Sequence, residues 1–338
     1  MVGKRKNLAD NALPPRVYRG KTQYEFHPAS GGSISLCPLD SLIPVVWARY
    51  QQANNYRNER KTLEHLINQF FLSADFMALA AETQKDYKRN STKLLPVFGK
   101  MHPDNVKPQH IRKYMDKRGT KSKTQANHEK SFLSRVYRWG YERGITKGNP
   151  CSGVRQFKEE ARDRYITDAE YEGLYSVAPD TVRIAMEIAY LCCARQSDVL
   201  SLTKSQLIDD GIFICQGKTG KKQIKAWTER LKKVIDLADS LPASQGVNSI
   251  YVLHQPNGNR YTRDGFNSSW AKARAKASVL HPELTFDFTF HDLKAKGISD
   301  LEGSLSEKQA ISGHKSIGQT ARYNRKTEIV PVVGGQKK

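Results

Sequence analysis

The side chains of this sequence with the clearest chemical potential are cationic and protic, and they are spread over its C-terminal half. In chain order they are Arg195, Asp198, Lys218, His291, Lys294, His314 and Tyr323. Cationic and imidazole groups of this kind bind phosphate-like anions without a metal. The sequence has no GxGxxG, Walker A, HExxH or GxSxG motif, and its acidic residues are scattered. Nucleotide-driven, zinc-hydrolase and metal-nuclease functions are therefore disfavoured.

Arg195 comes shortly after an apolar run, Val182 to Leu191, that predicts a buried helix. An arginine at the end of such a helix is costly to leave unpaired, so it either pairs with an acid or faces an anion site. Asp198 lies three residues further on and is a suitable partner. Taken alone, a structural ion pair is the better interpretation of Arg195.

The other candidates are also ambiguous one by one. Lys218 lies at the tip of a predicted hairpin, where a lysine is usually just solvated. His291 and Lys294 are three residues apart on a predicted helical turn, so both can approach one phosphate. His314 and Tyr323 are nine residues apart. A lone histidine is usually structural, and a lone tyrosine usually belongs to a core.

Taken together, the order and spacing of these residues resemble the tyrosine recombinase family, particularly phage integrases of the lambda type. That family has an arginine followed by an acid, a hairpin lysine, His-x-x-Arg, Gly-His and a later tyrosine. The matching positions here are Arg195 with Asp198, Lys218 in Gly-Lys-Thr-Gly, His291, Gly313-His314 and Tyr323. The resemblance covers residues 165–330, is looser over 57–159 and is weak over 1–55.

One position departs from the family pattern, because Lys294 stands where the family has its second arginine. Arginine can grip two phosphate oxygens with its fork of donors, whereas lysine offers a compact point charge. We expect Lys294 to neutralise the phosphate with some loss of orientation. A weakened or inactive enzyme is the alternative, and we favour an active one because every other position matches.

The resemblance implies a site-specific DNA recombinase that integrates and excises a mobile element. Tyr323 would attack a DNA phosphate to give a 3′-phosphotyrosyl link, which conserves the bond energy, so no cofactor or metal is expected. The charge would be stabilised by Arg195, Lys294 and His314, with Asp198 in support. His291 would act as a base or phosphate ligand, and Lys218 would protonate the leaving 5′-hydroxyl.

Two other functions remain open at this point. A type IB topoisomerase shares the tyrosine, arginine and lysine chemistry but would relax supercoils as a monomer. A non-catalytic DNA-binding regulator with the same fold would explain Lys294 as a sign of lost activity. The partners implied by the resemblance are double-stranded DNA attachment sites, a homotetramer on DNA, and DNA-bending and directionality proteins.

The composition supports a nucleic-acid partner. The chain has 338 residues, with 55 Lys and Arg against 34 Asp and Glu, for a net charge of +21. A surface this basic attracts polyanions. No apolar run reaches the length of a membrane span, so no membrane partner is expected. An odd number of cysteines without a CxxC pair fits a reducing compartment, so we expect the bacterial cytoplasm, near the nucleoid.

The predicted fold class is multidomain α+β, and the predicted domains are residues 1–55, 56–159 and 160–338. The first is a small β-sheet domain for arm-type DNA, although residues 1–13 fit a disordered basic tail equally well. The second is a helical core-site DNA-binding domain, a SAM-like four-helix unit. The third is a mixed α/β catalytic domain that ends in a tail. The apolar run Glu328 to Val333 in that tail fits packing on a neighbouring protomer or on its own chain.

Basic residues outside the catalytic set are the expected contacts to the DNA backbone. In the first domain they are Lys4, Arg5, Lys6, Arg16, Arg19 and Lys21. In the second they are Lys88, Lys93, Lys123 and Arg135. A charged helix face is usually just solvated, but here positive residues greatly outnumber negative ones, which favours DNA contact.

Overall fold

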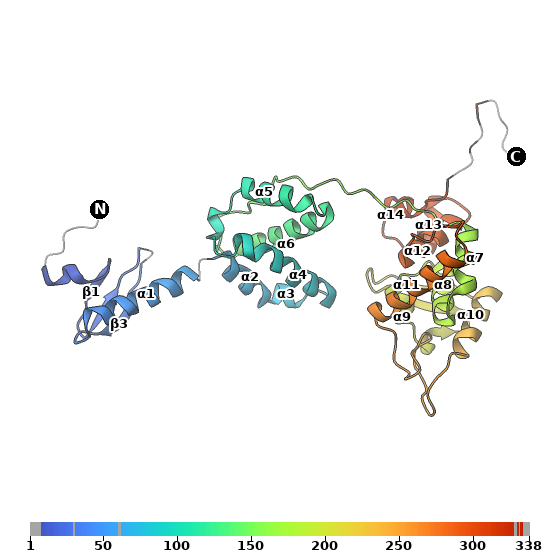
Figure 1. The fold of residues 1–338 in the computed structure, drawn as a ribbon, viewed down its shortest axis with the longest axis horizontal. Helices are drawn as coiled ribbons and strands as arrows, with labels where there is room; N and C mark the ends of the chain where they lie inside the picture. The colour runs from blue at the N-terminus through green and yellow to red at the C-terminus, as the bar shows by residue number, and fades with distance from the viewer. Residues whose placement is uncertain (1–7, 30, 60–61, 328–329, 331, 334–338) are drawn as a thin grey trace. The chain divides into compact units, whose positions relative to one another are not determined.

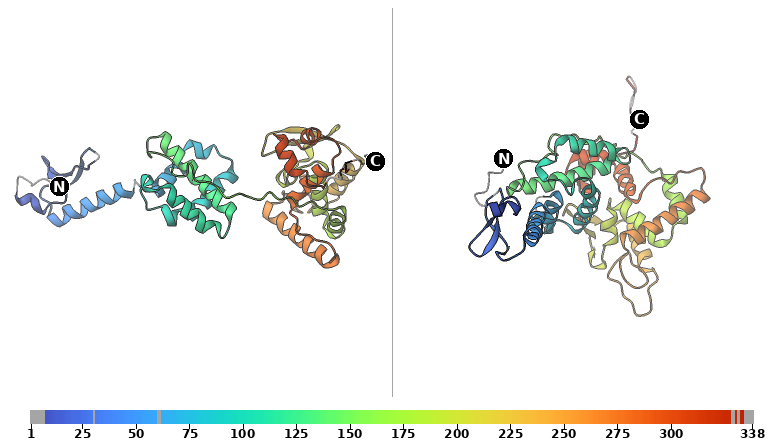
Figure 2. Two further views of the ribbon diagram at one scale, coloured as in Figure 1. Left: turned by 90° about the horizontal axis from the view of Figure 1, so that it is seen from above. Right: turned by 60° about the vertical axis from the view of Figure 1, so that its left-hand side comes forward.

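A computed structural model of the chain describes residues 8–29, 31–59, 62–327, 330 and 332–333. The chain divides into two units, Met1–Glu160 and Ala161–Lys338. Figure 1 labels their helices and strands, and Figure 2 shows the same elements from two further sides.

The N-terminal part of the first unit is a three-stranded antiparallel sheet with one helix beside it (Figure 1). Its elements are η1 (Leu8–Ala12), β1 (Val17–Arg19), β2 (Gln23–Phe26), β3 (Ile34–Pro38) and α1 (Ile43–Glu59). Tyr24 and Phe26 alternate with exposed or half-buried neighbours on β2 and pack with Val46 of α1 in a small core. The expected sheet is confirmed.

Helix α1 was not expected from the sequence, and it runs past residue 55, where the first domain was predicted to end. Its packing face is short: Ile43, Val46 and Tyr50 belong to the core at helical spacing. Beyond Tyr50 the sequence is mostly polar and the apolar stripe does not continue. The pattern was therefore too brief to separate a helix from a loop.

The rest of the first unit is helical, as predicted. Its elements are α2 (Leu63–Phe71), α3 (Ala74–Met77), α4 (Ala81–Phe98), η2 (Pro103–Asn105), α5 (Pro108–Gly119) and α6 (Lys123–Glu142). The four longer helices surround one aromatic-rich core, in which Phe70 contacts Phe132 and Trp139. The side chains of Thr62, Ser73 and Ser122 cap the first turns of α2, α3 and α6.

The second unit combines helices with a small sheet around helix α8. Its helices are α7 (Asp168–Val177), α8 (Asp180–Leu191), α9 (Gln196–Leu200), η3 (Lys204–Gln206), α10 (Glu229–Asp239), α11 (Arg263–Leu280), α12 (Phe290–Asp300), α13 (Leu305–Ser312) and α14 (Ile317–Tyr323). Most of α8 is buried, and it packs on α10 and α12. The expected multidomain α+β fold is confirmed.

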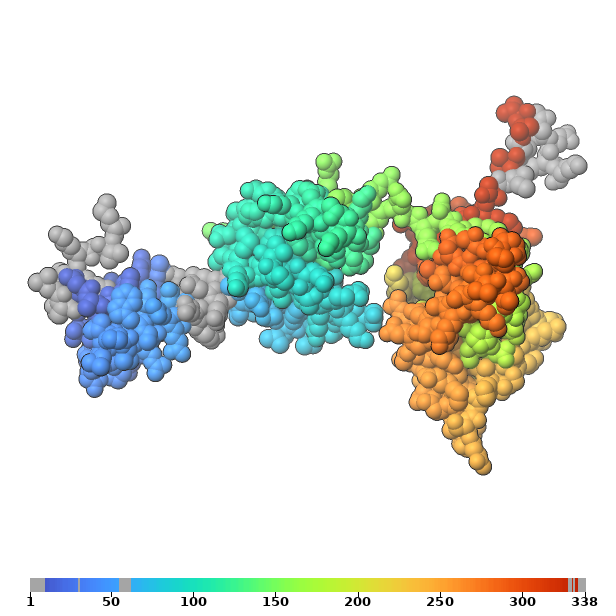
Figure 3. Space-filling model, viewed as in Figure 1, coloured from blue at the N-terminus to red at the C-terminus, as the bar shows by residue number. Residues whose placement is uncertain are grey.

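The sheet of the second unit has the order β4-β5-β6 and contains the predicted hairpin. Its strands are β4 (Leu207–Ile208), β5 (Gly211–Cys215) and β6 (Lys222–Ala226), so each hairpin strand begins one residue earlier than expected. The connection between α10 and α11 projects from this unit, in yellow and light orange in Figure 3. Within the described ranges, no helix is long and apolar enough to cross a membrane.

Candidate active site

The start of α12, the end of α14 and the segment between α13 and α14 bring three of the expected site residues together. The Nε2 atom of His291 lies 2.6 Å from the hydroxyl oxygen of Tyr323. The ring of His314 is also close, with its centroid 4.7 Å from that of Tyr323. The spacing that drew attention to Tyr323 thus corresponds to direct side-chain contact.

The position of Tyr323 is fixed by contacts between the residues around it and helix α12. Thr289 and Asp292 form a reciprocal capping box at the start of this helix. Asp292 also accepts a 2.6 Å hydrogen bond from Arg325, two residues after the tyrosine. Ser299 donates to the Tyr323 carbonyl at 3.0 Å and accepts from the Arg325 amide at 2.8 Å. Both sides of the Tyr323–Arg325 segment are therefore anchored.

His314 follows a glycine that ends α13 in the left-handed conformation. Gly313 has φ 67°, and a Cβ atom there would lie only 2.5 Å from the Nε2 atom of Gln216. The Nδ1 atom of His314 is 3.2 Å from the Thr320 hydroxyl. Its buried Nε2 atom has no hydrogen-bond partner among the described residues. This nitrogen is thus available to an anionic ligand.

Arg195 precedes α9 as its N-cap residue and is buried. Its guanidinium donates to the side-chain oxygen of Gln216 at 2.6 Å, whereas its distance to the Asp198 carboxylate is 4.0 Å. Asp198 instead accepts a hydrogen bond from the Gly217 amide at 3.1 Å. Gln216 is a site residue that the sequence analysis missed. The available signal was a polar residue directly after the apolar strand β5.

Lys294 lies beneath the site and is only 1% exposed. Its ammonium group donates to the carbonyl of Cys193 at 2.6 Å and to that of Ser312 at 3.3 Å. Burial, reinforced by the positive charge of Arg195, lowers the pKa of Lys294 to about 8. Lys294 therefore joins the segment before Arg195 to the segment before His314.

Lys218 is the one member of the expected set that stands apart. It is exposed in the turn between β5 and β6, and among the described residues no hydrogen bond or ion pair joins its side chain to the other members. Lys296, another lysine of α12, is bound elsewhere, to Asp168 at 2.5 Å and Asp300 at 2.9 Å. Lys218 can act in the site only if its turn brings the side chain to the reacting phosphate.

The two histidines have pKa values that favour their neutral forms. Desolvation by the surrounding protein lowers the pKa of His291 despite the nearby Asp292, although the side chain is partly exposed. Burial, together with the charges of Lys294 and Arg195, lowers the pKa of His314 to about 4. Burial also raises the pKa of Tyr323, while Arg195 acts in the opposite direction. At neutral pH a neutral imidazole therefore faces a protonated tyrosine.

Comparison with known proteins agrees with this arrangement. Residues 164–328 match the phage integrase family model, and residues 66–157 match the model of the phage integrase central domain. The chain belongs to the phage integrase family. Residues 164–328 contain the whole core of the second unit and every expected site residue from Arg195 to Tyr323. Residues 66–157 contain the core of the helical part except Leu63.

Relatives of this phage integrase family member include integrases of enterobacterial phages. It is 28% identical to the integrase of Escherichia phage HK022 over 204 residues, and 27% identical to that of Escherichia phage lambda over 206 residues. These matches span 57% of the chain and 56% of either relative. The chain thus matches little more than half the length of these curated relatives.

Solved structures show the same fold. A lambda integrase dimer bound to a COC′ core site aligns with a TM-score of 0.68 at 19% identity, covering 98% of this chain and 100% of that one. A lambda integrase tetramer bound to a Holliday junction aligns with a TM-score of 0.65 at 19% identity, covering 90% and 96%.

The expected DNA-binding residues are at the surface wherever the structure describes them. Lys4, Arg5 and Lys6 lie outside the described residues. The others are all exposed: Arg16, Arg19, Lys21, Lys88, Lys93, Lys123 and Arg135. Arg19 also donates to Asp10 at 2.9 Å, so part of its charge is offset. Contact of these residues with DNA stays a prediction.

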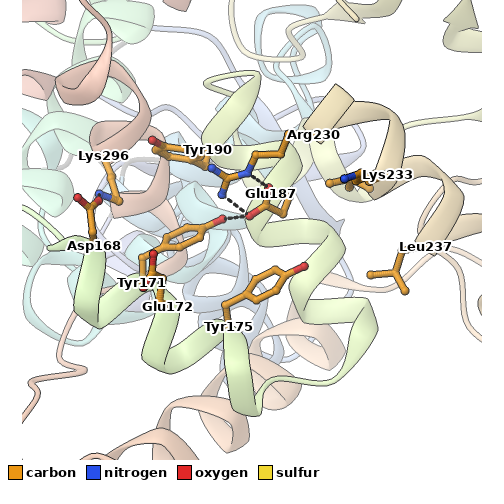
Figure 4. A pocket seen from close by; sticks show the side chains of 11 residues that line it. Asp168, Tyr171, Glu172, Tyr175, Glu187, Tyr190, Arg230, Lys233, Leu237 and Lys296 are labelled. Atoms are coloured by element: carbon orange, nitrogen blue, oxygen red, sulfur yellow. Dashed lines mark hydrogen bonds and ion pairs between the residues drawn. The ribbon is translucent and has the colours of Figure 1, made fainter. Parts of the chain in front are cut away.

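A pocket of about 290 Å³ in the second unit is separate from this constellation (Figure 4). None of the residues that line it belongs to the expected catalytic set. Its buried Glu187 accepts from Tyr171 at 2.7 Å and from Arg230 at 2.6 and 2.7 Å. This carboxylate is satisfied internally. No group of three or more potential metal ligands occurs in the part of the chain that the structure describes.

Proposed function

We propose that this chain is a site-specific DNA recombinase that cuts and rejoins DNA through a 3′-phosphotyrosyl intermediate. The contact between Tyr323 and His291, 2.6 Å long, carries the proposal. It places a phenol beside a base with a lowered pKa, next to buried Arg195 and His314. Nucleophile, base and charge-stabilising groups are what phosphoryl transfer requires.

Strand cleavage would begin with transfer of the Tyr323 proton toward Nε2 of His291. The phenolate oxygen forms a bond to phosphorus, and the bond from phosphorus to the 5′ oxygen breaks. Arg195 and the Nε2 atom of His314 stabilise the charge that builds on the non-bridging oxygens. Lys218 donates a proton to the leaving 5′ oxygen. Attack by the 5′-hydroxyl of a partner duplex then reverses these steps.

The role of Lys294 differs in this proposal from that of an arginine fork. Its ammonium is engaged by two backbone carbonyls, so it acts on the phosphate mainly through its positive charge. That charge matters more in a buried site than in water. Asp198 supports the site by holding the Gly217 amide, and thereby the start of the hairpin turn.

The proposed partners are double-stranded attachment sites and further copies of the chain. Solved lambda integrases form a dimer on a core site and a tetramer on a Holliday junction. We assign arm-type DNA to residues 1–55, core-site DNA to 56–159 and catalysis to 160–338. DNA-bending and directionality proteins would assist integration and excision of a mobile element. The site of action would be the bacterial cytoplasm, at the nucleoid.

The test is covalent selection from DNA of random sequence. The full chain is incubated with a library of nicked duplexes. Cleavage near the nick releases a short fragment that carries the 5′-hydroxyl, and because this fragment diffuses away, the adduct accumulates. Detergent-resistant adducts are isolated and sequenced. We expect one sequence family to be enriched with the wild type and none with Tyr323→Phe. Equal recovery from both proteins, or no adduct from either, would contradict the proposal.

Two further observations separate the proposal from its rivals. On a supercoiled plasmid lacking the selected site, a recombinase leaves the supercoils in place, whereas a type IB topoisomerase relaxes them. A non-catalytic regulator binds duplexes of the library reversibly but leaves no covalent adduct on any of them. Efficient relaxation, or binding without an adduct, would each replace the recombinase assignment.

A further inference from the structure

Gln216 connects three parts of the site through one buried amide. This side chain is 3% exposed. Its oxygen accepts from the Arg195 guanidinium at 2.6 Å and from the Thr219 hydroxyl at 3.0 Å. Its nitrogen donates to the Ser312 carbonyl at 2.9 Å. The amide therefore joins the charge clamp, the hairpin turn and the end of α13.

The backbone of Gln216 also closes the turn that carries Lys218. Its carbonyl accepts from the amides of Thr219 and Gly220, at 3.2 and 2.8 Å, and its amide donates to the Lys221 carbonyl at 2.8 Å. On the side before Lys218, the Gly217 amide is held by Asp198. The residues on both sides of Lys218 are thus tied to the Arg195 segment, although Lys218 itself is exposed.

The third connection leads toward His314. The Ser312 carbonyl that accepts from Gln216 also accepts from Lys294. Between Ser312 and His314 lies Gly313, whose missing Cβ leaves room for the Gln216 amide. A shift of this amide would therefore be transmitted to the turn before His314 as well as to the hairpin.

We propose that Gln216 is the positioning residue that sets the Lys218 turn against Arg195, so that the general acid reaches the leaving oxygen. The inference rests on the proposed function. Gln216 touches neither the reacting atoms nor the DNA in this account. It acts through the two residues it joins, and a misplacement of about 1 Å at such a group costs on the order of 100-fold in rate.

A leaving group that needs no proton separates this role from a purely structural one. Cleavage breaks the bond from phosphorus to the 5′ oxygen, and Lys218 supplies the proton that this oxygen takes up. If sulfur replaces the 5′ bridging oxygen, the same bond breaks and the sulfur leaves as a thiolate. A thiol has a pKa near ~8.5, so its departure needs little help from an acid. Defects in general-acid placement should therefore disappear on the sulfur substrate.

The experiment measures adduct formation by the full chain on the selected duplex with either oxygen or sulfur at the scissile bond. We expect Gln216→Met to be slowed about 100-fold on oxygen. On sulfur it should come within about tenfold of the wild type, because the general acid is no longer needed. Lys218→Ala should show the same rescue. Gln206→Met is the matched control, since Gln206 supports β5 through the Phe213 carbonyl and touches neither Arg195 nor the turn.

A second variant covers the case in which Gln216→Met fails to fold. Thr219→Val keeps the shape of a half-buried turn residue and removes its 3.0 Å hydroxyl bond to Gln216, together with a longer 3.5 Å contact from the Lys221 amide. We expect about a fivefold loss on oxygen and none on sulfur, as one neutral hydrogen bond contributes about 1 kcal/mol. If Gln216→Met slows adduct formation equally on oxygen and on sulfur, or if Thr219→Val slows it on neither, the inference is overturned. The proposed function would remain intact in both cases. If wild type forms no adduct on either substrate, the proposed function and the inference both fail.

Discussion

The Nε2 atom of His291 lies 2.6 Å from the hydroxyl oxygen of Tyr323, across a separation of 32 residues in the chain. The first residue is at the start of α12 and the second at the end of α14. Because desolvation by the surrounding protein lowers the pKa of His291, its neutral form is favoured and can accept the tyrosine proton. In the proposed mechanism, this contact supplies the nucleophile Tyr323 with its base.

The first prediction concerns this base. His291→Ala should slow adduct formation on the selected duplex by roughly 10²–10⁴-fold, the range of a general base, while DNA affinity stays near that of the wild type. His128→Ala is the control, because His128 is exposed on α6 and outside the site. Single-turnover rates and binding isotherms measure the two quantities. An unchanged rate would remove His291 from proton transfer.

The second prediction uses the ionisation of Lys294. Burial first, and then the charges of Arg195 and Lys225, lower its pKa, whereas Cys193 and Asp198 raise it, and the result is about 8. Above that pH the wild-type side chain loses its charge, but an arginine keeps it. Lys294→Arg should retain or raise cleavage at pH 7.

The ratio of the Lys294→Arg rate to the wild-type rate should then rise between pH 7 and pH 9. Titration of Tyr323 is common to both proteins and cancels in this ratio. A ratio that stays constant over this range would show that the charge of Lys294 does not assist cleavage. A complete loss of activity in Lys294→Arg would show that the space between the Cys193 and Ser312 carbonyls accepts only a lysine.

The third prediction concerns the pair that anchors Tyr323. Arg325 and Asp292 have side chains that are 7% and 1% exposed. Breaking a buried pair by removing one partner costs ~3–5 kcal/mol. The free energy of unfolding lost in Arg325→Met should lie at the low end of that range, since Arg162 still contacts Asp292 at 3.1 Å. Chemical denaturation measures it, with Arg322→Met on the exposed side of α14 as control.

The loss in free energy of unfolding caused by Arg325→Met should also depend on pH. Burial alone would raise the pKa of Asp292, but hydrogen bonds from Arg325 and Thr289 outweigh it and hold the pKa low. The stabilisation is therefore present above the ordinary aspartate pKa of ~3.9 and is lost as the pH falls through the lowered value. The difference between variant and wild type should shrink in acid. A difference that grew in acid would contradict this account.

The fourth prediction tests the DNA contacts of the helical part. Lys123 is exposed at the start of α6. If it neutralises a phosphate, Lys123→Gln should weaken binding of different sequences about equally and reduce the salt slope of binding by about one. Lys100→Gln, exposed just after α4 and not among the expected contacts, is the control. Unaltered slopes in Lys123→Gln would place this lysine outside the interface.

The sequence predicted much of the fold because its helices and hairpin carry strong periodic patterns. Helix α6 begins and ends where expected, and the hairpin is displaced by one residue. Helix α1 escaped prediction because its packing face ends at Tyr50. Short elements with few buried residues carry little signal.

The candidate site was only partly predictable for a different reason. Spacing along the chain connected His314 with Tyr323, but the bonds that hold them come from distant segments. Gln216 meets Arg195 across 21 residues and Ser312 across 96. A glutamine at a strand end has no distinctive pattern, so its role emerges only when these segments are folded together. The inward orientation of Lys294 was hidden for the same reason.

The most direct measurement of the central claim is the chemical identity of the DNA adduct. After proteolysis and nuclease digestion of the trapped complex, mass spectrometry locates the nucleotide on the peptide. We expect one modified residue, Tyr323, joined through its oxygen to a 3′-phosphate, with a free 5′-hydroxyl on the released strand. Attachment to another residue, or to a 5′-phosphate, would contradict the account.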